Sequence, residues 1–191
     1  MSDWTIVLWN DARQVAEEAG LHPASWPAPG VAPQAFFESL RSEGRADLAA
    51  LVMASFLPRH EAIAWVAAAL PNPSEDNPDF RTRRLILDAA RRWVDEPDDI
   101  NRRAVYALAE TANPEWPETL LGLAVFFSGG SIAPDDLEAV TANPAVAAHL
   151  AAAALQSAAV ERLPADEGVL ARALDLGNQV AIKGREALTR T

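Results

Sequence analysis

The sequence predicts an all-α fold, a single compact array of about nine mostly antiparallel helices with a short extended arm at the N-terminus. Three observations support this prediction. Alanine and leucine, both strong helix formers, account for 61 of the 191 residues. Fourteen prolines divide the chain into segments of helix length. The clearest of these segments places its apolar residues at helical spacing, so that they form one stripe.

Residues 1–32 are expected to form the arm, a short helix and a proline-rich loop ahead of a helical domain over 33–191. Trp4–Trp9 (WTIVLW) is rich in β-branched and aromatic residues, which favours a short strand or an extended arm. Asn10 has the character of an N-cap, which predicts a helix from Asp11 to Ala19. The three prolines that follow predict the loop.

Prolines, capping residues and apolar stripes set the limits of the remaining predicted helices. A proline can occupy the first position of a helix because that position needs no N–H donor. Glycine after a helix permits a left-handed stop. The predicted helices cover residues 33–41, 45–56, 58–70, 79–94, 99–112, 117–127, 134–140, 144–161 and 164–188.

The helix predicted over 99–112 has an apolar stripe on one face: Ile100, Ala104, Leu108 and Thr111. Arg102 and Tyr106 lie four residues apart on its other, outer face, where the guanidinium can stack on the ring. A weak repeat of about 41 residues, in the short segments that begin at Ala62, Ala104 and Ala145, permits HEAT-like helix pairs. An irregular helical bundle is the favoured alternative.

Composition excludes several classes of function. The formal net charge is -11, whereas nucleic-acid binding draws much of its affinity from a basic surface. Seven arginines between residues 81 and 103 are interspersed with five carboxylates, so we expect them to pair with each other. The chain has no cysteine, no secretory signal and no apolar run of the ~20 residues that span a bilayer. We therefore expect a soluble, cytoplasmic protein that binds no nucleic acid and does not insert into membranes.

No motif for catalysis, metal or cofactor is recognisable. His60-Glu61 begins like a zinc-protease helix, but position 64 is alanine where the second histidine is needed. Residues 128–131 (SGGS) lack the lysine and the preceding strand of a phosphate-binding loop. The acidic clusters at 75–79 and 95–99 fit helix capping. We predict no catalytic residue, no metal ligand and no cofactor.

Three stretches share a pattern in their order and spacing: LPRHEAIAW at 57–65, NRRA at 101–104 and FFSGGSIAP at 126–134. Together they resemble an uncharacterised all-helical bacterial protein family associated with type VI secretion gene neighbourhoods. The resemblance covers about residues 57–185. It implies no activity and at most an accessory or adaptor role. Its polar and aromatic positions match Arg59, Glu61, Trp65, Arg102 and Arg103, which are expected to form ion pairs between helices or, alternatively, a binding site.

The leading hypothesis is a non-enzymatic protein–protein interaction module, a bacterial cytoplasmic adaptor or accessory protein that works through a helical groove. Tryptophan is common at interface hot spots, so Trp26 in the proline-rich loop is a candidate contact; packing onto the bundle is the alternative. The candidate partner-binding residues are Trp26, Arg59, Glu61, Arg102 and Arg103. Alternatives are a small-ligand-binding protein or enzyme with a carboxylate/arginine site between helices, and self-association through the arm at Trp4–Trp9.

Overall fold

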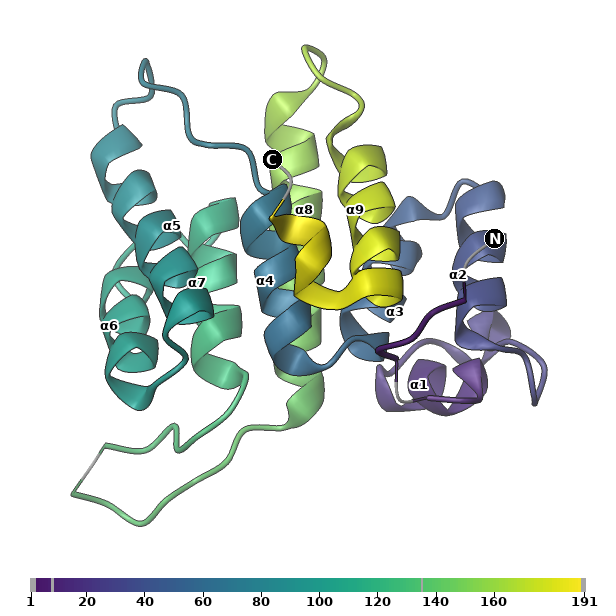
Figure 1. Cartoon of the computed structure of the whole chain (residues 1–191). Helices are drawn as coiled ribbons and strands as arrows, with labels where there is room; N and C mark the ends of the chain where they lie inside the picture. Colours follow the sequence, from purple (N-terminus) through teal and green to yellow (C-terminus); the bar gives the residue numbers. More distant parts are fainter. Residues whose placement is uncertain (1–2, 8, 135, 190–191) are drawn as a thin grey trace.

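A computed structural model describes residues 3–7, 9–134 and 136–189. Within these residues the chain forms nine α-helices and no strand, which confirms the predicted all-α class (Figure 1). The α-helices are α1 (Ala12–Glu18), α2 (Pro33–Ser42), α3 (Ala46–Phe56), α4 (Arg59–Ala69), α5 (Phe80–Asp95), α6 (Asp99–Ala109), α7 (Pro117–Phe127), α8 (Pro144–Arg162) and α9 (Val169–Lys183). Two short 3₁₀ helices are η1 (Pro23–Ser25) and η2 (Gly184–Leu188).

The helices form a row with α8 at its centre. Helices α5, α6 and α7 lie together at one end, and α1, α2 and α3 lie at the other (Figure 1). Helix α8 packs against α3, α4, α7 and α9 and so joins the two ends. Its alanine-rich sequence explains this position, because small side chains let several helices approach one axis closely.

The centre of the core is Trp65, which is fully buried as the apolar run of α4 predicts. Its indole Nε1 donates a hydrogen bond to the carbonyl oxygen of Ala173 on α9, at 2.7 Å. Helix α9 can approach this ring because residue 177 is glycine: a Cβ there would lie 2.8 Å from Cε2 of Trp65. The glycine and the tryptophan therefore set the spacing of α4 and α9.

The N-terminal arm has no regular secondary structure, bends at Thr5 and Ile6, and packs on the C-terminal end of α9. The backbone N–H of Thr5 donates to Ala181 O at 3.0 Å, and the indole Nε1 of Trp4 donates to Asn178 Oδ1 at 2.7 Å. The Trp4 ring also lies against Phe37 of α2, with ring centroids 5.4 Å apart. Of the two predicted forms, strand or extended arm, the described residues form no strand and make up an arm with a bend at Thr5 and Ile6; residue 8 lies outside them.

One predicted helix is absent from the described residues, and another begins at a different residue. The segment 134–140 is not a helix in its described residues: Ile132 N–H donates to Val140 O at 2.8 Å, and an antiparallel bridge joins Ser131 to Thr141. The apolar side chains of this segment remain exposed, so no packing stabilises a helix there. The last helix begins at Val169 instead of Pro164, because Asp166 accepts the Gly168 N–H and holds a turn before it.

Candidate functional site

The buried face of α6 is the face that the sequence pattern placed outside. Arg102 is only 4% exposed, whereas Ile100 on the predicted inner stripe is 81% exposed. Arg102 shares the buried face with Val105 and Ala109. A charged side chain is tolerated there because its donors are satisfied by hydrogen bonds, which a pattern of apolar residues does not reveal.

Arg102 binds the end of α7 and the loop that follows it. Its Nη1 donates to Phe126 O at 2.8 Å, its Nη2 donates to Ser131 O at 2.7 Å, and its Nε donates to Asp99 Oδ1 at 2.8 Å. Its guanidinium lies over the Phe126 ring, 4.8 Å from the centroid. The predicted stack of Arg102 on Tyr106 is therefore wrong: Tyr106 stacks on Phe126 instead, with centroids 4.0 Å apart.

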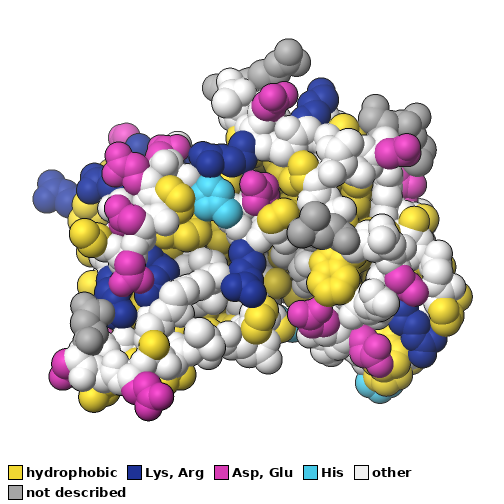
Figure 2. Space-filling model, turned by 60° about the horizontal axis from the view of Figure 1, so that its bottom comes forward, with side chains coloured by type: hydrophobic (Ala, Val, Ile, Leu, Met, Phe, Trp, Pro, Cys, Tyr) yellow, Lys and Arg dark blue, Asp and Glu magenta, His cyan; other side chains and the backbone are white. Residues whose placement is uncertain are grey.

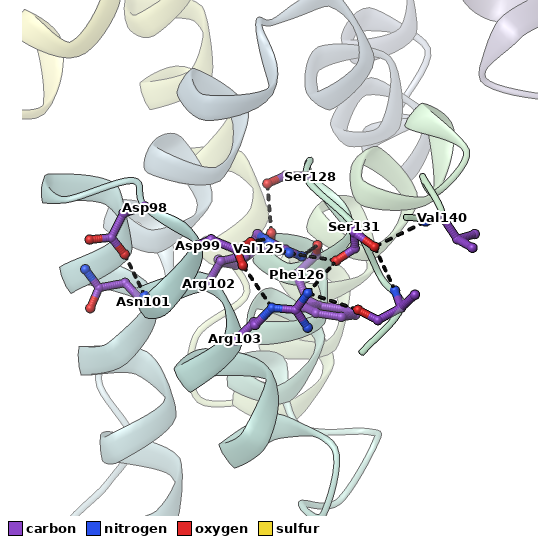
Figure 3. Close-up of polar contacts among 11 residues, drawn as sticks. Asp98, Asp99, Asn101, Arg102, Arg103, Val125, Phe126, Ser128, Ser131 and Val140 are labelled. Carbon is purple, nitrogen blue, oxygen red and sulfur yellow. Dashed lines mark hydrogen bonds and ion pairs between the residues drawn. The ribbon is translucent and has the colours of Figure 1, made fainter. Parts of the chain in front are cut away.

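Arg103, the next residue, reaches the same loop. Its Nη2 donates to Ala133 O at 3.0 Å and its Nε donates to Asp99 Oδ2 at 2.9 Å. Asp99 is thus shared by both arginines, and their hydrogen bonds, first that of Arg102, hold the pKa of its carboxyl below the usual value. Figure 3 shows the two side chains converging on the loop.

Arg59, at the first position of α4, also contacts this region. Its side chain is exposed, and its Nη1 donates to Ser128 O at 3.1 Å. Three arginines of the resemblance thus donate to backbone carbonyls between residues 126 and 133, and we name Arg59, Arg102 and Arg103 the arginine clamp. The last carbonyls of a helix lack intrahelical partners and carry partial negative charge, so cations at the end of α7 are favourable.

The clamp requires a glycine where the chain turns. Gly130 has φ +69°, a left-handed conformation that glycine adopts without strain. A Cβ at this position would also lie 2.9 Å from Arg102 Nη2. The SGGS segment is therefore explained by backbone geometry and by the close approach of the arginine.

The described residues 131–134 and 136–143 extend from the clamp, and we name them the projecting loop (Figure 1). At its base, Ser131 Oγ accepts from the N–H groups of Ala133 and Val140, at 3.1 and 3.2 Å. Leu137, between these two bonded positions, is 62% exposed, and Val140 is 50% exposed although its backbone belongs to the base. Three acidic residues and no basic residue occur in this stretch of the sequence. The loop therefore presents apolar side chains and negative charge from a fixed base.

Arg59 also lines two cavities. A mainly apolar cavity of about 330 Å³ lies between α1, α3, α4 and the start of α8. A second cavity of about 440 Å³ lies on the α6 side, with Arg102, Trp93 and Gly130 in its lining. Figure 2 shows this end of the molecule, where hydrophobic, basic and acidic side chains are interspersed.

The structure does not bring Trp26 to the clamp. Its loop lies beside α1 and α2, at the other end of the row from α6 (Figure 1). Its Nε1 donates to Leu21 O at 2.8 Å, and the guanidinium of Arg13 lies 5.2 Å from its ring centroid. Glu61 lies in the first turn of α4, half-buried, and has no ion pair within the described ranges. A partner-binding role for these residues and for the clamp stays a prediction.

A second charged cluster was not recognised from the sequence. Arg83 on α5 is 3% exposed and Glu118 on α7 is 1% exposed. Arg83 Nε donates to Glu118 Oε2 at 2.9 Å, and its Nη2 donates to Glu161 Oε2 of α8 at 2.7 Å. The two carboxylates raise the pKa of Arg83, the hydrogen bond of Glu161 first, and Arg83 lowers the pKa of Glu161. Glu118 follows Pro117 at a helix start, so its sequence context indicated only a favourable N-terminal charge.

The Arg83 cluster joins three helices and lines a small cavity of about 190 Å³. Its buried charges bond to one another, so we interpret it as a structural connection between α5, α7 and α8. Among the described residues, no group of three or more metal-binding side chains gathers in one place. Within residues 3–7, 9–134 and 136–189, no helix is both long enough and apolar enough to cross a membrane.

Fold and site together define an all-α protein in which the three clamp arginines hold the base of the projecting loop. The family model described as "Family of unknown function (DUF6931)" matches residues 36–181, so the chain belongs to this family. The match includes the clamp and the projecting loop, and it agrees with the resemblance to an uncharacterised family. Neither the search of curated proteins nor the search of solved structures found a match.

Proposed function

We propose that the protein is a non-enzymatic protein–protein interaction module, an adaptor or accessory protein that docks a partner through the projecting loop. The observation that carries the proposal is the arginine clamp. Three arginines from two helices hold the backbone at the base of the loop, while the side chains of Leu137 and Val140 stay exposed. Side chains presented from a fixed base bind with a smaller loss of conformational entropy than those of a flexible segment.

The chemistry of the loop indicates the kind of partner. Exposed aliphatic side chains such as Leu137 and Val140 can fill apolar pockets on a partner, which is typical of the anchors at the centre of an interface. The acidic side chains around them favour a partner surface with basic residues at the rim of that pocket. The clamp arginines take part by holding the loop, and Arg59 can also contact the partner because its side chain is exposed.

The proposal also includes a biological setting. We place the protein in the bacterial cytoplasm, as an accessory protein encoded in type VI secretion gene neighbourhoods. The resemblance of residues 57–185 supports this setting, and the net charge of -11 argues against nucleic acid as the partner. The proposed partner is another protein, or a second copy of the chain.

Affinity capture from the native host tests the proposal. The tagged protein is compared with a loop variant, Leu137→Ser with Val140→Ser, and with a control that changes two exposed aliphatic residues elsewhere, Leu85→Ser with Val160→Ser. We expect a stoichiometric protein in the captures with wild type and control, and its loss with the loop variant. A partner that the loop variant retains would contradict the loop as the docking site. The absence of any partner and of self-association would contradict the interaction module itself.

Ligand binding is the second candidate function. It is favoured by the apolar cavity beside Arg59, whose side chain makes a single hydrogen bond within the part of the chain that the structure describes. The carboxylate/arginine cluster at Arg83 supports it less, because Arg83 and Glu118 are buried and bonded to each other.

A further inference from the structure

We infer that the apolar cavity beside Arg59 binds an aliphatic carboxylate, with the hydrocarbon chain among α1, α4 and α8 and the carboxylate at Arg59. This site is distinct from the projecting loop, and the inference rests on the second candidate function, ligand binding, for which it names the class of ligand. The inference depends on the shape and lining of the cavity, on the unused donors of Arg59, and on the backbone at the start of α4.

The lining is suited to a hydrocarbon chain. Trp9, Val15, Leu57, Ile63 and Ala148 contribute apolar surface from four different parts of the chain. Burial of such a chain is favourable because it removes apolar surface from water on both sides. The volume of about 330 Å³ is at the lower end of the range for small-molecule sites, roughly 300 to 1,000 Å³. A chain of medium length therefore fits better than a large cofactor.

Arg59 differs from the other arginines that contact this region. Arg102 donates from all three of its guanidinium nitrogens to the protein, whereas Arg59 makes one hydrogen bond, to Ser128 O, in the described part of the chain. The other N–H groups of Arg59 are thus available to an anion at the edge of the cavity. A guanidinium can bind a carboxylate through two parallel hydrogen bonds, which discriminates it from an alcohol.

The start of α4 adds donors beside Arg59. Pro58 is the N-cap residue and also lines the cavity, and it has no side-chain acceptor to cap the helix. The first three N–H groups of α4 therefore have no acceptor among the described residues. These groups carry partial positive charge, so they reinforce the preference of Arg59 for an anion.

Among the described residues, Glu18 is the one carboxylate in the lining, and it opposes a bound anion. It also makes the inference testable with a ligand of the opposite charge. If Glu18 dominated, the cavity would prefer an aliphatic amine; because Arg59 and the start of α4 both favour negative charge, we expect it to prefer the acid. Glu18→Gln should then strengthen binding of the acid by about 2- to 5-fold, since a like charge is removed.

Isothermal titration calorimetry with octanoate, 1-octanol and octylamine tests the site directly on the full chain. We expect octanoate to bind saturably with a Kd below about 1 mM and the other two to bind at least about 10-fold more weakly. Arg59→Met should weaken octanoate binding by about 10- to 100-fold, the range for a lost charge-assisted hydrogen bond. Arg92→Met, at an exposed arginine of α5 outside the cavity, is the matched control and should leave binding unchanged.

A cavity-filling variant separates a local effect from a loss of folding. Ala145→Leu places a larger side chain at a half-buried position of the lining and should abolish octanoate binding while the thermal midpoint stays close to that of wild type. Equal binding of octanol, tighter binding of octylamine, or no saturable binding of octanoate would each overturn the inference. Unchanged binding by both Arg59→Met and Ala145→Leu would overturn it as well. None of these results bears on partner capture by the projecting loop.

Discussion

Replacing Arg83 by methionine should destabilise the fold more than any change at an exposed arginine. The substitution leaves Glu118 buried without the guanidinium that donates to it at 2.9 and 3.2 Å. An unpaired buried charge costs about 3–5 kcal/mol when its partner is removed. For a chain of this size, 1 kcal/mol corresponds to about 2–4 °C, so the thermal midpoint should fall by roughly 6 to 20 °C.

Urea unfolding followed by far-UV circular dichroism measures this loss as a free energy of unfolding. Arg84→Met is the control, because Arg84 is the next residue and its ion pair with Asp88 is exposed on the helix surface. Exposed pairs contribute about 0–1 kcal/mol, so the control should remain close to wild type. An unchanged dependence of the unfolding free energy on urea would show that both variants unfold from the same fold.

A double variant tests the stated cause. Arg83→Met combined with Glu118→Leu removes both buried charges and replaces them with apolar side chains of similar size. It should recover most of the loss, because a buried pair often contributes little beyond an apolar replacement. The reasoning is refuted if Arg83→Met costs less than about 1 kcal/mol, or if the double variant is no more stable than the single one.

Two further predictions concern the core and the clamp. Gly177→Ala should destabilise the protein by about 1–3 kcal/mol despite the better helix propensity of alanine, because the new Cβ meets the buried ring of Trp65 at 2.8 Å. Urea unfolding measures this loss, and a variant more stable than wild type would contradict the prediction. Arg102 and Arg103 lower the pKa of Asp99, so its contribution to stability is present above the unfolded-state pKa of about 3.9 and is lost as pH falls through the lower folded-state value. Asp99→Asn should therefore flatten the fall in stability below about pH 5, and an equally steep fall in wild type and variant would argue against this origin.

The helix limits that local signals specify were predicted well. Helix α7 begins at Pro117 and helix α8 at Pro144, because proline at the first helical position needs no N–H partner. The predicted helix at 134–140 did not form, because proline and acidic residues favour a helix start but nothing packs on the segment to complete it, and the last helix begins at Val169 and not at Pro164. Local signals thus predicted where helices can start, and packing decided which of them form.

The candidate site was predicted only in part. The spacing of the resemblance selected Arg59, Arg102 and Arg103, and the structure brings all three to the carbonyls of residues 126–133. The preference for tryptophan at interface hot spots selected Trp26, whose loop lies at the other end of the row of helices (Figure 1). Residue type made Trp26 a candidate, but residue type contains no information on which loop lies near which helix end.

By itself, the sequence determined the helical class of this protein, most of its helix limits and the burial of Trp65. These follow from propensity, capping and apolar runs, which act over a few residues of chain. Only the tertiary structure decided that Arg102 faces inward and that Arg83 joins Glu118 and Glu161, residues 35 and 78 positions away. The physical reason is that a buried charge is acceptable only when its partners are in place, and those partners come from distant helices that meet only in the folded chain.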